Sequence, residues 1–107
     1  MRCEMNEGIA KTIPLLTEPF VRMGIYKTQE EALKQLVLQH IELQIEEARR
    51  EIAHFQRKYG TDFEKWTESL VGRATVEEED DWMKWESARD MLESWEKVRA
   101  EIERCNV

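Results

Sequence analysis

The sequence predicts a mainly α-helical fold, with one long central helix packed by a C-terminal helical hairpin. Apolar residues recur at alternating spacings of three and four over two long stretches, which is the pattern of one helix face. Three Thr-x-x-Glu segments mark helix starts, because the Thr oxygen can accept from the amide three residues on while the Glu side chain reaches back. Gly24, Gly60 and Gly72 each follow an apolar stretch, where a left-handed residue can end a helix.

The central helix is predicted to begin at Thr28, which opens the segment Thr28-Gln-Glu-Glu31, and to end before Gly60. At ~1.5 Å per residue it would be about 48 Å long, so it must pack along another helix, its own or a partner's. The apolar stripe predicted for this helix consists of Leu33, Val37, Ile41, Ile45, Ala48, Ile52, Phe55 and Tyr59.

Two helices form the predicted hairpin. The shorter covers residues 62–71, is capped by the box Thr61 to Glu64, and is ended by Gly72. The longer covers residues 76–104 and is capped by the box Thr75 to Glu78. Residues 1–60 are thus interpreted as a dimerisation module with the long helix, and 61–107 as an acidic hairpin packing on it within one domain. The stripe of the last helix consists of Trp82, Trp85, Ala88, Leu92, Trp95, Val98 and Ile102.

The segment before Thr28 is less regular. Residues 9–15 are predicted as a possible short strand, with Pro14 near its end. Pro19 can occupy the first turn of a short helix that reaches about Met23, because that position needs no backbone N–H.

Composition favours a protein that binds another protein. Apolar residues make up 41% of the 107 residues and charged residues 36%, so the core is small and some apolar surface is expected to be buried against a partner. A homodimer or a higher homo-oligomer is the expected state. The net charge is −7. Lys/Arg and Asp/Glu balance through Gly60, and the whole acidic excess follows it. An acidic surface repels nucleic acid and attracts basic proteins, although a solvated helix surface is an alternative.

Cysteine use and hydropathy point to the cytoplasm. Cys3 and Cys105 lie near opposite ends without Cys-x-x-Cys spacing, which leaves a single bridge between the termini or, as the favoured interpretation, free thiols in a reducing compartment. No leader peptide and no apolar run of ~18 residues is found, so membrane association is not expected.

The segment Gly24-Ile-Tyr26-Lys-Thr28-Gln-Glu-Glu31-Ala32 resembles the turn of ribbon-helix-helix proteins, which include many antitoxins of prokaryotic type II toxin–antitoxin pairs. Residues 58–66 and 81–86 resemble small uncharacterised archaeal and bacterial helical proteins. The first resemblance implies a dimer whose paired strands enter the DNA major groove.

DNA binding is the less favoured part of that resemblance. The possible strand presents no face of polar or basic side chains to read bases, and the module that carries it has no net positive charge, so the electrostatic part of DNA affinity is small. The residues that would contact DNA are Lys11, Arg22, Lys27 and Thr28.

Metal binding and catalysis have weaker signals. His40, Glu47, Glu51 and His54 fall within a ~60° arc of the long helix, and Glu51-Ile-Ala-His54 has the Glu-x-x-His spacing of di-metal bundles. The arc lies beside the apolar stripe, so solvated charge is the favoured interpretation and a metal-binding bundle the alternative. No nucleophile motif or phosphate loop is present, and neither enzyme activity nor a cofactor is expected.

The expected partner surface combines tryptophans with acids of the last helix. Aromatic anchors with a charged rim are typical of interfaces, although the same spacing would place these tryptophans in a core. The favoured function is an antitoxin-like protein that dimerises and neutralises a basic toxin, and the alternative is a self-associating helical protein with no toxin. The predicted partner-binding residues are Trp82, Trp85, Trp95, Asp80, Asp81 and Glu86.

Overall fold

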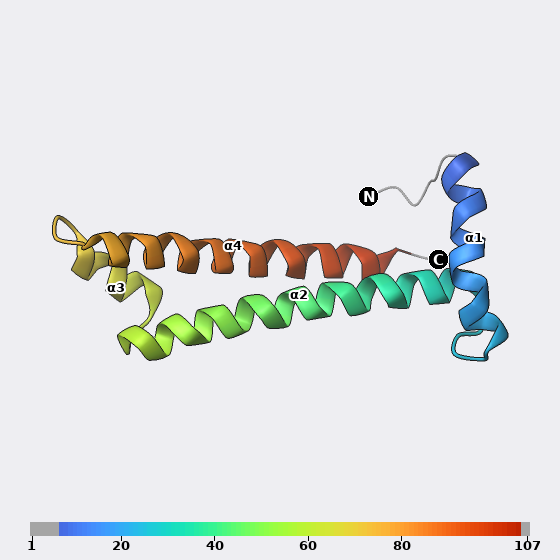
Figure 1. Ribbon diagram of the computed structural model, residues 1–107, viewed down its shortest axis with the longest axis horizontal. Helices are drawn as coiled ribbons and strands as arrows, with labels where there is room; N and C mark the ends of the chain where they lie inside the picture. Colours follow the sequence, from blue (N-terminus) through green and yellow to red (C-terminus); the bar gives the residue numbers. More distant parts are fainter. Residues whose placement is uncertain (1–6, 106–107) are drawn as a thin grey trace. The chain divides into compact units, whose positions relative to one another are not determined.

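The computed structural model describes residues 7–105, and within that range the chain forms four α-helices and no strand. The predicted mainly helical fold is therefore confirmed. Each of these helices is too polar or too short to cross a bilayer. The helices are α1 (Glu7–Arg22), α2 (Gln29–Tyr59), α3 (Phe63–Leu70) and α4 (Val76–Arg104) (Figure 1).

The chain divides into two compact units, and the boundary falls inside the two long helices. Unit 1 comprises Met1–Glu42 with Lys97–Val107, and therefore contains α1, the start of α2 and the end of α4. Unit 2 comprises Leu43–Glu96, and contains the rest of α2, all of α3 and most of α4. Each unit thus joins segments that are far apart in the sequence.

Three glycines end helices or turns as predicted. Gly24 has φ +76°, and the amides of Gly24 and Ile25 donate to the carbonyls of Val21 and Phe20 at 2.9 Å each, which is the Schellman arrangement. Gly60, with φ +67°, donates to the carbonyl of Gln56 and ends α2. Gly72, with φ +74°, follows the end of α3 in a turn closed by Arg73 N–H and the Leu70 carbonyl at 3.0 Å.

The helix starts agree with two of the three predicted boxes. Thr75 forms the complete box, since its N–H donates to Glu78 Oε1 and its Oγ1 accepts from the Glu78 amide. Thr28 Oγ1 accepts from the Glu31 amide at 3.1 Å. At α3 the prediction is wrong by one residue: Asp62 is the cap, and its Oδ1 accepts from the Lys65 amide at 2.8 Å. A carboxylate interacts more strongly with the positive helix start than a hydroxyl does.

The strand predicted over residues 9–15 is not formed, because these residues belong to α1. Pro14 and Pro19 both lie inside this helix. Thr17 is buried, and its Oγ1 donates to the Ile13 carbonyl at 2.8 Å. The buried side of α1 has helical spacing that continues past residue 15. The seven residues 9–15 alone are too few to show this spacing, so they favour a strand. The residues of this side that are buried or half-buried are Ile13, Pro14, Thr17, Phe20 and Val21.

Unit 2 is held by a cluster of aromatic rings around the fully buried Trp85 of α4. Phe55 of α2 stacks on Trp85 with ring centroids 5.8 Å apart, and Trp66 of α3 stacks on it at 5.4 Å. Tyr59 stacks on Trp66 at 4.1 Å, and Phe63 meets Trp85 edge-on at 5.4 Å. Aromatic pairs of this kind add roughly 0.5–1.5 kcal/mol beyond area burial. The cluster therefore fixes α2, α3 and α4 of this unit together.

Unit 1 has fewer large buried apolar side chains than unit 2 among the described residues. Ala32 and Ile41 of α2 are buried, whereas Val37, predicted in the same stripe, is 37% exposed. Lys34 Nζ donates to the carbonyls of Glu103 and Cys105 at the end of α4, at 3.2 and 3.4 Å, where a positive charge favours the helix dipole.

The cysteines differ from the expected free thiols in one respect. Cys105 is disulfide-bonded, so the free-thiol prediction is wrong for this residue. Cys3 lies outside the described residues.

Replacing Gly60 by Ala is expected to destabilise the protein by about 1 kcal/mol, because an L-residue with a side chain is strained at positive φ. Apart from the glycine itself and its two chain neighbours, no atom lies within 4 Å of the added Cβ, so the cost comes from the backbone alone. Urea denaturation measures it. Gly60→Asn is the matched control and should lose less stability, since Asn tolerates this conformation. Equal midpoints for all three proteins would contradict the helix-stop role.

Candidate partner-binding surface

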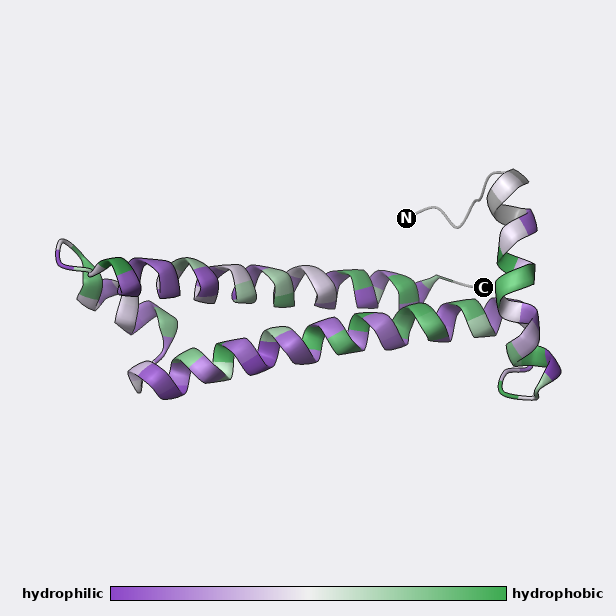
Figure 2. Ribbon diagram, in the orientation of Figure 1, coloured by the Kyte–Doolittle hydropathy of each residue, from purple (hydrophilic) through white to green (hydrophobic). Residues whose placement is uncertain are grey.

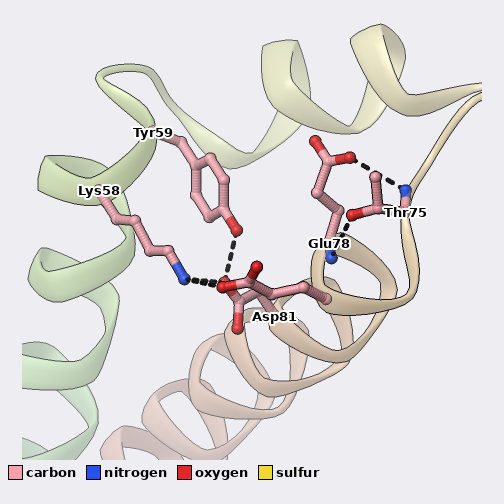
Figure 3. A network of polar contacts seen from close by, with 6 residues as sticks. Lys58, Tyr59, Thr75, Glu78 and Asp81 are labelled. Atoms are coloured by element: carbon pink, nitrogen blue, oxygen red, sulfur yellow. Dashed lines mark hydrogen bonds and ion pairs between the residues drawn. The ribbon is translucent and has the colours of Figure 1, made fainter.

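One of the three predicted partner-binding acids, Asp81, is buried. Asp81 of α4 is 7% exposed, and its Oδ2 accepts from Lys58 Nζ at 2.6 Å and from the Tyr59 hydroxyl at 2.5 Å. Lys58 also donates to Glu77 Oε1 at 3.2 Å. Figure 3 shows both α2 side chains converging on the carboxylate, one helical turn from the box of Thr75. Asp81 therefore joins α2 to α4 and offers no surface to a partner.

The hydrogen bonds of this bridge change the acidity of all three groups. The bond from Lys58, and then that from Tyr59, lower the pKa of Asp81 below its ordinary value of 3.8. Burial, together with the bond to Asp81, raises the pKa of Tyr59 to about 12. The Asp81 carboxylate and then Glu77 raise the pKa of Lys58 above its usual value. The bridge is therefore a charged Lys–Asp pair with a neutral tyrosine at neutral pH.

The tryptophans divide between core and surface, which the spacing left open. Trp85 and Trp66 are buried in the aromatic cluster. Trp82 is half-buried: its ring stacks on Phe63 at 5.7 Å, and its indole N–H donates to Thr67 Oγ1 at 2.9 Å. Trp95 is also half-buried and lines a different groove of unit 2. Of the predicted aromatic anchors, Trp82 is the one that reaches the surface beside the acidic start of α4.

An apolar groove lies between α3 and α4 in unit 2, with a volume of about 400 Å³. Two side chains that the sequence prediction did not include are strongly exposed at this groove, namely Val71 at 78% and Met83 at 55%. Met83 follows Trp82 in the sequence and does not belong to the predicted apolar stripe. An apolar residue off the stripe is the sequence signal that could have identified it. The residues lining the groove are Thr67, Leu70, Val71, Ala74, Glu79, Trp82 and Met83.

The division into units sharpens the charge asymmetry. Unit 1 contains eight Lys/Arg and eight Asp/Glu, whereas unit 2 contains eight Lys/Arg and fifteen Asp/Glu. The entire net charge of −7 therefore belongs to unit 2. Asp80 is exposed and Glu86 half-exposed on α4, and Glu79 lines the groove itself. The apolar groove thus lies in the acidic part of the molecule.

The residues considered for metal binding are all exposed. His40 belongs to unit 1, whereas Glu47, Glu51 and His54 belong to unit 2. Glu47 and Glu51 line the second groove, which Trp95 also lines, and the His54 ring packs against Phe55. Within residues 7–105, no group of three or more His, Cys, Asp or Glu side chains is placed to hold a metal ion.

The residues considered for DNA binding lie in unit 1 and are exposed. Lys11 is on α1, and Arg22 pairs with Glu18 one turn earlier at 3.5 Å. Lys27 lies in the turn, and Thr28 serves as the cap of α2. Because α1 replaces the predicted strand, the described chain has no ribbon on which these residues would be presented to a major groove.

The motif that carries the ribbon-helix-helix resemblance builds the turn between α1 and α2. Gly24 ends α1 and Thr28 caps α2. Tyr26 accepts a hydrogen bond from Gln39 Nε2 at 3.0 Å, and Ala32 is fully buried. Each of these roles serves any two helices joined by such a turn. The motif therefore explains the local geometry without DNA.

Comparisons with protein-family models, curated proteins and solved structures found no match to this chain.

Asp81→Asn is expected to destabilise the protein at pH 7 by on the order of 1–2 kcal/mol, because it replaces a charged acceptor of two hydrogen bonds by a neutral one. The native pKa of Asp81 is lowered, so its contribution is present above about pH 4 and is lost as pH falls through the native pKa. Denaturant titrations of both proteins from pH 7 to pH 2 should show the difference shrinking with acidity.

The neighbouring exposed acid provides the control for this experiment. Asp80→Asn changes the net charge equally but removes no contact of the bridge, so its effect should be within about 0.5 kcal/mol at every pH. Equal losses in Asp81→Asn and Asp80→Asn would show that general charge, and not the bridge, causes the effect.

Proposed function

We propose that this chain is an antitoxin-like protein that binds and neutralises a basic partner protein through its acidic unit 2, with unit 1 serving self-association. The observation that carries the proposal is the separation of charge between the units: unit 1 is neutral and unit 2 carries the whole charge of −7. Charge complementarity of this kind steers association and selects partners of the opposite sign.

Surface chemistry in unit 2 supports binding of a protein. Exposed apolar side chains gather at one groove, and Trp82 forms part of its wall. Large exposed apolar patches are rare on monomeric proteins, and those with a polar rim commonly mark interaction sites. A basic nuclease toxin fits this surface, because the acids of unit 2 would take the place of the phosphates that such an enzyme binds.

Neutralisation is tested in the native cell. We expect affinity purification of the chain to recover one small basic protein in stoichiometric amount. That protein should arrest growth when expressed alone, and co-expression of this chain should restore growth. Recovery of only acidic or neutral proteins, or of a basic protein whose expression is harmless, would contradict the proposal.

The charge dependence has a matched control. Replacing Glu79, Asp80 and Glu86 by Gln, Asn and Gln removes three charges from unit 2, and should weaken capture by tenfold or more at low salt, because attraction to a basic protein falls. Replacing Glu30, Glu101 and Glu103 by Gln removes three charges from unit 1 and should leave capture unchanged. Equal weakening by the two triple variants, measured by titration calorimetry, would show that location of the charge is irrelevant.

Self-association is favoured by the outward face of α1. Leu15 is 78% exposed and Leu16 is 65% exposed, and Met23 is exposed about two turns further on. Figure 2 shows the corresponding hydrophobic stretch in the middle of α1. The occupant that fits this face is a second copy of the chain, because unit 1 is neutral and does not repel itself, whereas two copies of unit 2 repel each other.

Leu15→Glu with Leu16→Glu is expected to convert a dimer into a monomer of 12.8 kDa in analytical ultracentrifugation. Both side chains are exposed, so circular dichroism should report unchanged helix content. Leu43→Glu, at a position of unit 2 that is 60% exposed, is the control and should remain dimeric. A monomeric wild-type chain at micromolar concentration would refute self-association through α1.

A further inference from the structure

The exposed side chains at the groove between α3 and α4 are carried by a turn with its own backbone hydrogen bond. Val71 follows α3 in the turn that Gly72 makes possible, and this turn is closed by Arg73 N–H and the Leu70 carbonyl. Val76, the first residue of α4, is also strongly exposed. Apolar side chains thus project from both sides of one short connection, although neither is needed to cover the aromatic core.

The floor of the groove presents hydrocarbon surface. The only polar atom of the Trp82 side chain, its indole N–H, already donates to Thr67 Oγ1. Leu70 and Ala74 add aliphatic surface, and Met83 adds a flexible thioether side chain. Methionine adapts to the shape of whatever packs on it and is frequent at surfaces that bind helices.

The rim of the groove is acidic. Glu79 precedes Trp82 by three residues and Glu86 follows it by four, so both lie on the same side of α4 as the groove. The connection contains one base, Arg73, whose Nε donates to the Ser69 carbonyl at 3.0 Å. A ligand in the groove would therefore meet apolar side chains at the centre and carboxylates along the α4 side.

We propose that this groove binds an amphipathic helix of the basic partner, with apolar residues at helical spacing on one face and Lys or Arg flanking them. Such helices dock through anchors three and four residues apart, and the carboxylates on α4 select basic flanks. This inference rests on the proposed function, because it names the segment of the partner that unit 2 recognises. Trp82 and Met83 serve as the central contacts, and Val71 closes the other side.

The experiment uses a fluorescein-labelled 16-residue peptide of Leu and Lys with amphipathic helical spacing, titrated with the full chain and followed by anisotropy. We expect saturable binding that weakens at least tenfold between 50 and 500 mM salt. Two comparison peptides, one with Glu in place of Lys and one with the same Leu and Lys in scrambled order, should bind at least tenfold more weakly. Equal binding of all three peptides would overturn the proposal.

Matched variants locate the binding. Val71→Ser with Met83→Ser should weaken the amphipathic basic peptide at least tenfold, whereas Leu43→Ser with Met91→Ser, two other exposed apolar positions of unit 2, should not. Circular dichroism of both variants checks that the helices are retained. Equal effects of the two variants would place the binding outside this groove.

A second readout requires no disruptive variant. In the wild-type chain labelled with 5-fluorotryptophan, the ¹⁹F signal of Trp82, assigned through Trp82→Phe, should shift on addition of the peptide. The signal of the buried Trp85 should shift much less. An unmoved Trp82 signal at saturating peptide would overturn the proposal.

Failure of this inference can be told from failure of the proposed function. If the basic partner from the cell is still captured fully by Val71→Ser with Met83→Ser, the groove assignment is wrong while neutralisation stands. If the groove binds the peptide as described but no toxic basic partner exists, the groove stands and the proposed function is wrong.

Discussion

The burial of Trp85 is the constraint on which the rest of unit 2 depends. Its indole contacts rings from both other helices of the unit, with Phe55 on α2 and Trp66 on α3. A single large aromatic side chain that contacts two helices fixes their distance from its own helix, because the interior tolerates neither voids nor overlap. The position of α3 against α4, and so the existence of a groove between them, follows from this contact.

The Lys58–Tyr59–Asp81 bridge joins α2 to α4, and its Asp81 end lies one turn before Trp85 on α4. Asp81 precedes Trp85 by four residues, so both face α2. A carboxylate so close to an aromatic core would be costly without partners, and the two hydrogen bonds from α2 supply them. The bridge therefore adds a charged, directional contact to a cluster that is otherwise apolar, and it removes one acid from the surface.

The two units differ in charge, and this difference gives the chain two kinds of surface. Neutral unit 1 presents exposed leucines on α1, and acidic unit 2 presents an apolar groove that Glu79 lines. Like charges oppose contact between copies through unit 2, while nothing comparable opposes it through unit 1. Self-association and partner binding can therefore occupy separate surfaces of one small chain.

The sequence by itself determined where helices end and which long faces are apolar. Gly24, Gly60 and Thr75 act locally, through backbone conformation and hydrogen bonds within a few residues, so no tertiary information is needed to place them. The stripes of α2 and α4 follow for the same reason, since periodicity is a property of one helix. Thr61 and Asp62 are adjacent and both are good capping residues, so the local pattern alone did not decide between them. The cap in the structure is Asp62.

Only the tertiary structure decided which members of those stripes and acidic runs are inside. Asp80 and Asp81 are identical side chains one position apart, yet only Asp81 faces Lys58 and Tyr59, which lie 22 or more residues earlier. Trp82 and Trp85 differ in the same way, because rings of both α2 and α3 pack on Trp85, whereas Trp82 contacts Phe63 of α3 and lines a groove. Burial depends on what a neighbouring helix contributes, and no spacing within one helix contains that information.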